Sequence, residues 1–389
     1  MLKRLRVENF RNIKHAELEF CAGVNVFYGD NAQGKTNMLE ALSVCLGRGF
    51  RRARPATLTP FGSSDAETTL ELVYEPDAFP GKENVVVYKL SGGNATVSIN
   101  GIPLKNASDL YGELKHVVFA PEHLTLIKGS PELRRFYIDN IAVLQNKTHK
   151  RAAADYVSAM KQLAALNFDL AGNPEDFSTR DMMGIWNDIL IRQGINLTYG
   201  RLKYFQPLRD CAMRIYNELT DGREELNMLY KSDIYGSIDE ELPDFGENGL
   251  NELYLAYSKR LKAAESDPAP DHRIKVGVHK DDIVFNINGV NAREFGSQGQ
   301  IKSLSLIMKL SEAEIIRSYN HEVPVMLLDE VLGELDMGRR DFIINRLGGA
   351  QVFITSCDYH DFENARDLRV WEVKNGEFHS PGGERFGLL

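Results

Sequence analysis

The sequence has few cysteines and no long apolar stretch. Its four cysteines form no CxxC pair and no zinc-ligand spacing, which argues against a disulfide framework and a zinc site. No apolar run approaches the ~20 residues that a membrane-spanning helix needs. The first eight residues carry charges where a secretory signal has its apolar stretch. These absences predict a cytoplasmic protein with reduced thiols and no membrane partner. The cysteines are Cys21, Cys45, Cys211 and Cys357.

Repeats and low-complexity tracts are also missing. Hydrophobic residues make up 43% and charged residues 26% of the 389 positions, so the chain is neither disordered nor collagen-like. This length predicts one large domain or two of medium size.

The formal charge of −9 argues against nucleic acid, because affinity for a duplex comes largely from cations that displace counterions. The charge is uneven, however. Residues 1–60 contain ten Lys and Arg residues against five acidic ones. A local basic face and an ordinary charged edge both fit this asymmetry.

The hydrophobic pattern predicts an α/β protein with a helical insert. Strands are expected around residues 5–10, 18–20 and 24–28, a helix over 35–46, and hairpins between 85 and 101. Helical patterning then begins at Ser130-Pro131 and continues to about 264. Strands are expected again at 273–278 and 283–287, and a hairpin at Asn375-Gly376.

The predicted domains are therefore 1–130, the first part of an α/β head, 131–268, a helical arm, and 269–389, the second part of the head. Apolar stripes within the arm, such as Tyr156, Met160 and Leu163, are typical of packing faces.

The segment Gly29 to Thr36 matches the phosphate-loop pattern G-x-x-x-x-G-K-[ST] between a strand and a helix. Backbone N–H groups of such a loop surround the β-phosphate, and glycine lets the chain approach closely. We expect Lys35 to bridge the β- and γ-phosphates of ATP and the Thr36 hydroxyl to bind Mg²⁺. The predicted nucleotide contacts are Gly29, Asp30, Asn31, Ala32, Gln33, Gly34, Lys35 and Thr36.

A short apolar run at 325–328 predicts a buried parallel strand, and Asp329-Glu330 follows it directly. Together with the phosphate loop, this pair predicts a metal site and a base. Asp329 would hold magnesium, and Glu330 would orient or deprotonate the attacking water. Taken alone, the pair also fits a strand end that faces solvent.

Ser297, Gly299 and Gln300 precede a long amphipathic helix. A serine at such a helix start caps it, and a serine and a glycine there can also present donors to a γ-phosphate. The spacing leaves both roles open.

Together these residues resemble the ABC/SMC-type ATPase head. The resemblance rests on Gly29 to Thr36, on the S-x-G-Q signature at Ser297 to Gln300, and on the run from Leu327 to Asp336. The opening segment 7–13, the segment 117–124 and Arg134-Arg135-Phe136 are more specifically similar to the RecF family of recombination mediators.

The resemblance implies an ATP-dependent homodimer that sandwiches two nucleotides. Ser297 and Gly299 of one subunit would act on ATP held by the other, so Ser297 joins Lys35 and Glu330 as a predicted catalytic residue. It also implies binding to double-stranded and gapped DNA in replication and recombinational repair, with RecO- and RecR-type partners that help load RecA, and a weak ATPase that serves as a switch.

Some positions depart from the wider pattern of such heads. Ala32 stands where glycine is common, and Thr355-Ser356 stands where transporter heads carry a switch histidine. His360 is too far along the chain to be assumed equivalent. These departures resemble RecF and favour slow hydrolysis.

Two clusters are candidates for DNA contact, and ordinary surface is the competing interpretation of each. They comprise Arg51, Arg52, Arg54, Lys147, Lys150 and Arg151. Side chains of this kind follow phosphates without reading bases.

Two other functions stay open from the sequence. An SMC-like head could serve another task, such as that of a defence-system ATPase. A phosphotransferase acting on a small molecule is the other, although it would need neither the signature segment nor the arm.

Overall fold

The computed structural model describes residues 1–47, 57–60, 67–173, 176–238, 242–265, 273–331, 337–359, 362 and 367–380. The chain divides into two compact units. The first, called here the head unit, comprises Met1–His123 and Glu312–Leu389, and the second, the helical unit, is Leu124–Ser311. Residues 269–311 thus group with the helical unit, whereas the sequence pattern assigned them to the head. The functional limits at 130/131 and 268/269 stay a prediction.

A mostly parallel sheet forms the centre of the head unit, in the order β16-β15-β3-β14-β13-β8. All five residues of β13 are buried, as expected for an apolar strand flanked on both sides. Strands β8, β13, β14, β3 and β15 run parallel to one another, so their carboxyl ends share one edge, and β16 pairs antiparallel with β15. The strands are β3 (Val24–Tyr28), β8 (His116–Phe119), β13 (Val325–Asp329), β14 (Val352–Ser356), β15 (Leu368–Lys374) and β16 (Glu377–His379).

The strand register fixes which residues meet at that edge. Ser356 of β14 lies opposite Tyr28, where β3 ends, and Thr355 lies opposite Asp329, where β13 ends. The phosphate loop after Tyr28 and the carboxylates after Leu328 therefore leave the sheet side by side.

A second, antiparallel sheet completes the head unit, in the order β2-β1-β4-β5-β6-β7. The hairpins predicted between residues 85 and 101 are confirmed. Gly92-Gly93 and Asn100-Gly101 have positive φ at both turn residues, as tight hairpin turns require. The strands are β1 (Leu2–Phe10), β2 (Ile13–Glu19), β4 (Thr68–Tyr74), β5 (Asn84–Ser91), β6 (Asn94–Ile99) and β7 (Ile102–Pro103).

Helix α1 (Lys35–Cys45) contacts strands of both sheets, and its buried Met38, Leu39 and Leu42 join their common core. This packing fixes the helix start, and with it the phosphate loop, relative to the carboxyl edge of the parallel sheet. The remaining elements of the head unit are η2 (Ala107–Leu110), η3 (Pro121–Leu124, its last residue in the helical unit), α9 (Met337–Arg346) and the last part of α8 (Gln298–Asn320).

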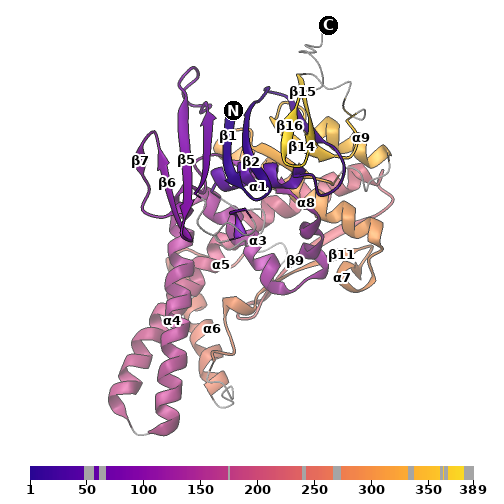
Figure 1. The fold of residues 1–389 in the computed structure, drawn as a ribbon. Helices are drawn as coiled ribbons and strands as arrows, with labels where there is room; N and C mark the ends of the chain where they lie inside the picture. The colour runs from indigo at the N-terminus through magenta and orange to yellow at the C-terminus, as the bar shows by residue number, and fades with distance from the viewer. Residues whose placement is uncertain are drawn as a thin grey trace. The chain divides into compact units, whose positions relative to one another are not determined.

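In the helical unit, α4 (Lys147–Gly172) and α5 (Phe177–Leu219) pack along each other as a long hairpin (Figure 1). Asn146 and Asp176 cap the two helices through their side chains. Ser130 stands at the N-cap position before α3, but its side chain makes no capping bond. None of the helices that the structure describes combines the length and apolar character needed to cross a bilayer. The other helices are α2 (Thr125–Lys128), α3 (Pro131–Gln145), α6 (Glu247–Glu265) and α7 (Ala292–Phe295).

Two predictions for the helical unit were wrong. A four-stranded sheet, β10-β9-β11-β12, includes residues 226–238, where helix was expected. Burial along β9 alternates with a period of two, which is a strand pattern. Residues 273–278 form no strand, because Gly277 has φ 139° and its N–H donates to the Asp233 carboxylate instead of a ladder. The elements here are β9 (Leu226–Ser232), β10 (Gly236–Ile238), β11 (Asp282–Ile287), β12 (Val290–Asn291) and η4 (Val278–Lys280).

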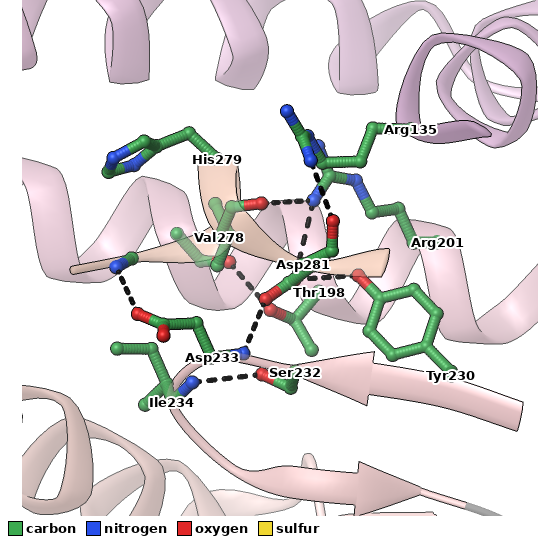
Figure 2. A network of polar contacts seen from close by, with 12 residues as sticks. Arg135, Thr198, Arg201, Tyr230, Ser232, Asp233, Ile234, Val278, His279 and Asp281 are labelled. Atoms are coloured by element: carbon green, nitrogen blue, oxygen red, sulfur yellow. Dashed lines mark hydrogen bonds and ion pairs between the residues drawn. The ribbon is translucent and has the colours of Figure 1, made fainter. Parts of the chain in front are cut away.

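A buried polar network joins these strands to α5 (Figure 2). The Asp281 carboxylate accepts from the Tyr230 hydroxyl at 2.7 Å and from the Asp233 N–H at 2.9 Å. Arg201 contacts Asp281 at 3.4 Å and donates to both oxygens of Asp139 at 2.8 and 2.9 Å. Burial raises the pKa of Asp281. Although burial also opposes the charge of Asp139, Arg201 holds the pKa of that carboxyl well below its usual range.

Candidate nucleotide-binding site

The phosphate loop connects β3 to α1 through backbone conformations that few residues adopt. Gly29, Ala32 and Gly34 have φ values of 148°, 65° and 119°. A Cβ at Gly29 would lie 2.5 Å from the carbonyl oxygen of Val373, so glycine is required there. Ala32 is exposed, and its methyl group is accommodated in the left-handed conformation.

The ammonium group of Lys35 lies inside this loop. Its side chain is only 2% exposed, and Nζ donates to the carbonyl oxygens of Gly29 at 2.6 Å and Asp30 at 3.1 Å. Nζ also lies 3.6 Å from Oε1 of Glu330 and 3.9 Å from Sγ of Cys357. A buried cation held by carbonyl groups is placed to exchange them for phosphate oxygens, which are stronger acceptors.

Thr36 and Asp329 lie in contact although 293 residues separate them. The Thr36 hydroxyl donates to Oδ1 of Asp329 at 2.8 Å, and the Asp329 side chain is almost fully buried. Two hard oxygen donors suit Mg²⁺, which commonly takes one or two protein ligands and completes its shell with phosphate and water. In the part of the chain that the structure describes, no cluster of three or more His, Cys, Asp or Glu residues could hold a metal ion by itself. The residues present fit a magnesium ion that arrives with a nucleotide.

Glu330 leaves the sheet in a left-handed conformation, with φ 52°. Its side chain is 44% exposed, so solvent reaches it although Oε1 lies 3.6 Å from Nζ of Lys35. Its N–H donates to Oγ1 of Thr355 at 2.8 Å. Glu330 therefore lies beside Lys35 with access to water, as a base for water activation would.

The outer face of the loop is held by two turns. The Gln33 carbonyl accepts from Nδ2 of Asn12 at 3.0 Å and from the N–H of Gly376 at 2.8 Å, and Oε1 of Gln33 accepts from the N–H of Asn375 at 2.8 Å. A Cβ at Gly34 would lie 2.9 Å from the Asn12 side chain. Asn12 thus supports the loop from the β1–β2 turn. Sequence reasoning missed this role, although N-F-R-N at residues 9–12 was part of the resemblance.

Thr355 and Cys357 were also missed as site residues. The Thr355 hydroxyl donates to Oδ1 of Asp329 at 2.8 Å, and Sγ of Cys357 lies 3.5 Å from Oδ1 of Asn31. The available signal was their position just after the strand Val352–Ile354, which lies next to β13. That signal marks an edge of a sheet but does not say which side chains turn toward the loop.

Ser297 and Gly299 belong to the helical unit, where α8 begins. The Gln300 N–H donates to Oγ of Ser297 at 3.2 Å, and the Ser297 N–H donates to Oε1 of Gln300 at 2.9 Å. This reciprocal pair is a capping box. Nε2 of Gln300 also donates to Oε1 of Glu224 at 2.9 Å. The cap role of Ser297 is present, and its role toward a nucleotide stays a prediction.

The predicted DNA contacts fall into two groups. Arg51, Arg52 and Arg54 lie outside the described residues, as do Asp336 and His360. The other group, Lys147, Lys150 and Arg151, is exposed on the first turns of α4. Nε of Arg151 lies 3.8 Å from the Asp155 carboxylate.

Known sequences resemble the chain over almost its whole length. Residues 1–378 match the family model for the RecF/RecN/SMC N-terminal domain. The DNA replication and repair protein RecF of Clostridium acetobutylicum is 33% identical over 379 residues, which cover 96% of this chain and 98% of the relative. RecF of Clostridium tetani is 32% identical over 379 residues, 97% of this chain and 98% of its own.

Solved structures match as well. The recombination mediator protein RecF in the RecFOR pathway, solved as RecF-ATP, has a TM-score of 0.85 and 29% identity, with 98% of this chain and 99% of that chain covered. Its RecF-ATPrS form has a TM-score of 0.86 with 98% of both chains covered. An Smc head bound to the C-terminal winged-helix domain of ScpA, 14% identical with a TM-score of 0.54, shares the fold alone. The chain therefore belongs to the RecF family of DNA replication and repair proteins and has the α/β fold of an SMC-type ATPase head.

Proposed function

We propose that the protein is an ATP-dependent, dimerising DNA-binding protein of recombinational repair, in which slow ATP hydrolysis acts as a switch. The observation that carries the proposal is the meeting of Lys35, Thr36, Asp329 and Glu330 at one edge of the parallel sheet. A cation, two metal-ligating oxygens and a carboxylate are the groups that phosphoryl transfer to water requires.

The chain's own residues account for nucleotide binding. Lys35 would release the Gly29 and Asp30 carbonyl groups and donate to phosphate oxygens. Thr36 and Asp329 would hold the magnesium ion, which would supply positive charge to the phosphate oxygens, including those of the leaving ADP. ATP binding would also weaken the attraction between the Lys35 ammonium group and the Glu330 carboxylate, because the ammonium group would then interact with the phosphates.

Slow hydrolysis follows from the groups around Glu330. This carboxylate would orient the attacking water, yet the strand that ends beside it carries Thr355-Ser356, where transporter heads have a histidine. We assign one base to the site and no second proton-transfer group. We therefore expect slow ATP hydrolysis, which would set how long the ATP-bound state lasts.

Dimerisation is proposed from the signature segment. Ser297 is exposed, and it precedes a helix of 23 residues whose N-terminus favours anions. We propose that Ser297 and Gly299 of one copy donate to the γ-phosphate of ATP on a second copy. ATP would then drive closure by binding the dimer more tightly than the monomer.

DNA is the proposed macromolecular ligand, as duplex and as duplex with a single-stranded gap. Lys147 and Lys150 begin α4, whose first turn has no acidic residue. Cations at a helix N-terminus interact unfavourably with the helix dipole, so their presence there costs some stability. A role in binding DNA phosphates would account for that cost. RecO- and RecR-type partners and loading of RecA are proposed from family membership.

The test is the solution mass of Glu330→Gln with magnesium, with and without ATP and with a gapped duplex. Removing the base while keeping the metal ligands should trap the closed state. We expect a shift from one chain mass to two with ATP and a further species with DNA. The matched control, Lys35→Ala with Glu330→Gln, should stay at one chain mass.

Absence of any shift would contradict the dimer and leave Ser297 as a helix cap. Hydrolysis by the wild type that rises linearly with protein concentration from the nanomolar range upward would point to a monomeric phosphotransferase instead.

A further inference from the structure

Thr355 lies at the end of β14, directly opposite Asp329 in the parallel ladder. It is 2% exposed, and its side chain is turned toward the metal-site edge of the sheet. A threonine at the end of a strand is common, so the sequence alone does not indicate a function for it. The contacts of this hydroxyl are what distinguish it.

One hydroxyl here touches both predicted carboxylate residues. Oγ1 of Thr355 donates its proton to Oδ1 of Asp329 at 2.8 Å and accepts the N–H of Glu330, also at 2.8 Å. A hydroxyl has one proton and two lone pairs, so these bonds use its donor and one of its acceptor sites. The same atom therefore orients the side chain of Asp329 and the backbone of Glu330.

The hydrogen bond from the Glu330 N–H to Thr355 stabilises a backbone conformation that is unfavourable for glutamate. Glu330 is not glycine, yet its φ is 52°. Such a conformation is strained for a residue with a Cβ and persists only when its surroundings fix it. If the N–H lost its acceptor, Glu330 could relax and move its carboxylate away from Lys35.

The bond to Asp329 matters because Thr36 shares the same acceptor. Both hydroxyls donate to Oδ1 of Asp329. When the Thr36 oxygen serves as a metal ligand, its proton must point away from the metal. That proton can still be donated to Oδ1 of Asp329, and Thr355 is the second donor that holds the Asp329 carboxylate in place.

We propose that Thr355 is a positioning residue that couples the metal-binding Asp329 to the base Glu330. The inference rests on the proposed function of this site. One side chain sets both the magnesium affinity and the orientation of Glu330, so its loss impairs both together.

The test compares Thr355→Val, which keeps the shape but loses the hydroxyl, with Thr355→Ser, which keeps it. Thr68→Val is the matched control: Thr68 is a buried strand threonine of the other sheet of the head unit, with its hydroxyl bonded to the Asn9 carbonyl. The first readout needs no nucleotide. Amide hydrogen exchange at Glu330 should accelerate in Thr355→Val and stay near wild type in Thr355→Ser and Thr68→Val.

The second readout is the affinity for a fluorescent ATP analogue with magnesium and with chelator. Loss of a residue that orients a metal ligand typically lowers metal affinity by about 10- to 100-fold. Thr355→Val should lose a comparable part of the magnesium-dependent gain, keep the chelator affinity, and show a lowered kcat. Thr355→Ser should restore all three values.

A Thr355→Val protein with wild-type amide exchange and wild-type magnesium dependence would overturn the inference and leave the proposed function standing. Loss of affinity in chelator as well as in magnesium would mean that Thr355 only supports the fold. A wild type whose nucleotide affinity does not respond to magnesium would refute the proposed function and the inference with it.

Discussion

At the residue scale, Cys357 lies beside Lys35, so the reactivity of its thiol can be used to detect nucleotide in the site. Cys357 is exposed and lies 3.9 Å from the Lys35 ammonium group. The other cysteines are shielded to different degrees: Cys45 and Cys211 are buried, and burial raises the pKa of Cys21 and Cys45. Since the thiolate is the reactive form, a maleimide should modify Cys357 first.

We predict that MgATP protects Cys357 from this reagent. At saturation the labelling rate should fall by about the ratio of ATP concentration to Kd, roughly 100-fold at 100 Kd. Mass spectrometry of peptides that contain Cys357, taken over time, measures the rate. Labelling that ATP leaves unchanged would place the nucleotide elsewhere.

Lys35→Ala should remove this protection. The ammonium group would make charge-assisted bonds to phosphate, and losing them should weaken ATP binding by about 10- to 100-fold. An equilibrium titration with a fluorescent ATP analogue gives the affinity directly. Thr68→Val is the control, because its hydroxyl donates to the Asn9 carbonyl within the other sheet. Nucleotide affinity equal to wild type in Lys35→Ala would refute the site assignment.

At the element scale, the start of α8 combines a structural role with a proposed catalytic one. Oγ of Ser297 caps the helix, and the same hydroxyl is the proposed donor to ATP on a second copy. Two substitutions separate these roles. Aspartate is as good a cap as serine, but its charge repels a phosphate, whereas alanine loses both functions.

Ser297→Ala should cost about 1 kcal/mol of unfolding free energy, and Ser297→Asp close to nothing. Both should abolish the ATP-dependent mass shift in the Glu330→Gln background. Chemical denaturation and solution mass are the two measurements. Dimers formed normally by Ser297→Asp would show that the residue is only a cap.

Another element-scale feature is the hydrogen-bonded chain behind η4. Nε2 of His279 faces the Ile274 carbonyl at 3.1 Å and must donate, so Nδ1 accepts the Tyr156 hydroxyl at 2.9 Å. Burial lowers the pKa of His279 to about 4, and a proton on Nδ1 would also require the Tyr156 hydroxyl to accept instead of donate. The folded state thus binds this proton less readily than the unfolded state, whose pKa is near 6.5.

The pH dependence of stability follows from that difference. Stability from neutral His279 is complete above pH 6.5 and is lost as pH falls toward 4, by up to about 3 kcal/mol. Urea unfolding followed by Trp186 fluorescence in a Trp371→Phe background isolates the helical unit. His279→Asn should flatten the profile between pH 6.5 and 4, and His379→Asn, at an exposed position, should not. Equal slopes in all three proteins would contradict the assignment.

The sequence was most informative where one segment carries the whole pattern. The phosphate loop and the strand before Asp329 could be predicted because glycine spacing and an apolar run are local signals. Thr355 and Asn12 could not, because their roles arise from register between strands far apart in the chain. The alternation along β9 was a local signal, but the helical patterning on either side masked it.

At the scale of the whole molecule, a chain of net charge −9 is proposed to bind DNA, a polyanion. Long-range repulsion must then be overcome by local cations, so affinity should fall steeply with salt. We predict that replacing Lys147, Lys150 and Arg151 by alanine lowers the slope of log K against log salt by about 0.9 for each phosphate that the protein no longer neutralises. Fluorescence anisotropy with a gapped duplex over a salt series measures that slope.

The control for that prediction is Lys259→Ala with Lys262→Ala, two exposed lysines on α6. These changes remove comparable charge from the same unit and should leave the slope nearly unchanged. If both sets of substitutions changed the slope of log K against log salt equally per charge removed, the start of α4 would affect DNA binding only through the net charge of the protein. That result would contradict a direct contact between these residues and DNA.

The support of Gln33 by Asn12 and by the turn at Asn375-Gly376 has a consequence during synthesis. A ribosome releases residues in order, so Thr36 of the phosphate loop emerges 293 residues ahead of Asp329, and the supporting turn emerges later still. Every residue of the helical unit, 124–311, leaves the ribosome before that turn does. A nascent chain with its arm already formed would therefore lack the support of the phosphate loop, and the proposed ATP-dependent dimerisation would be restricted to chains translated past Gly376.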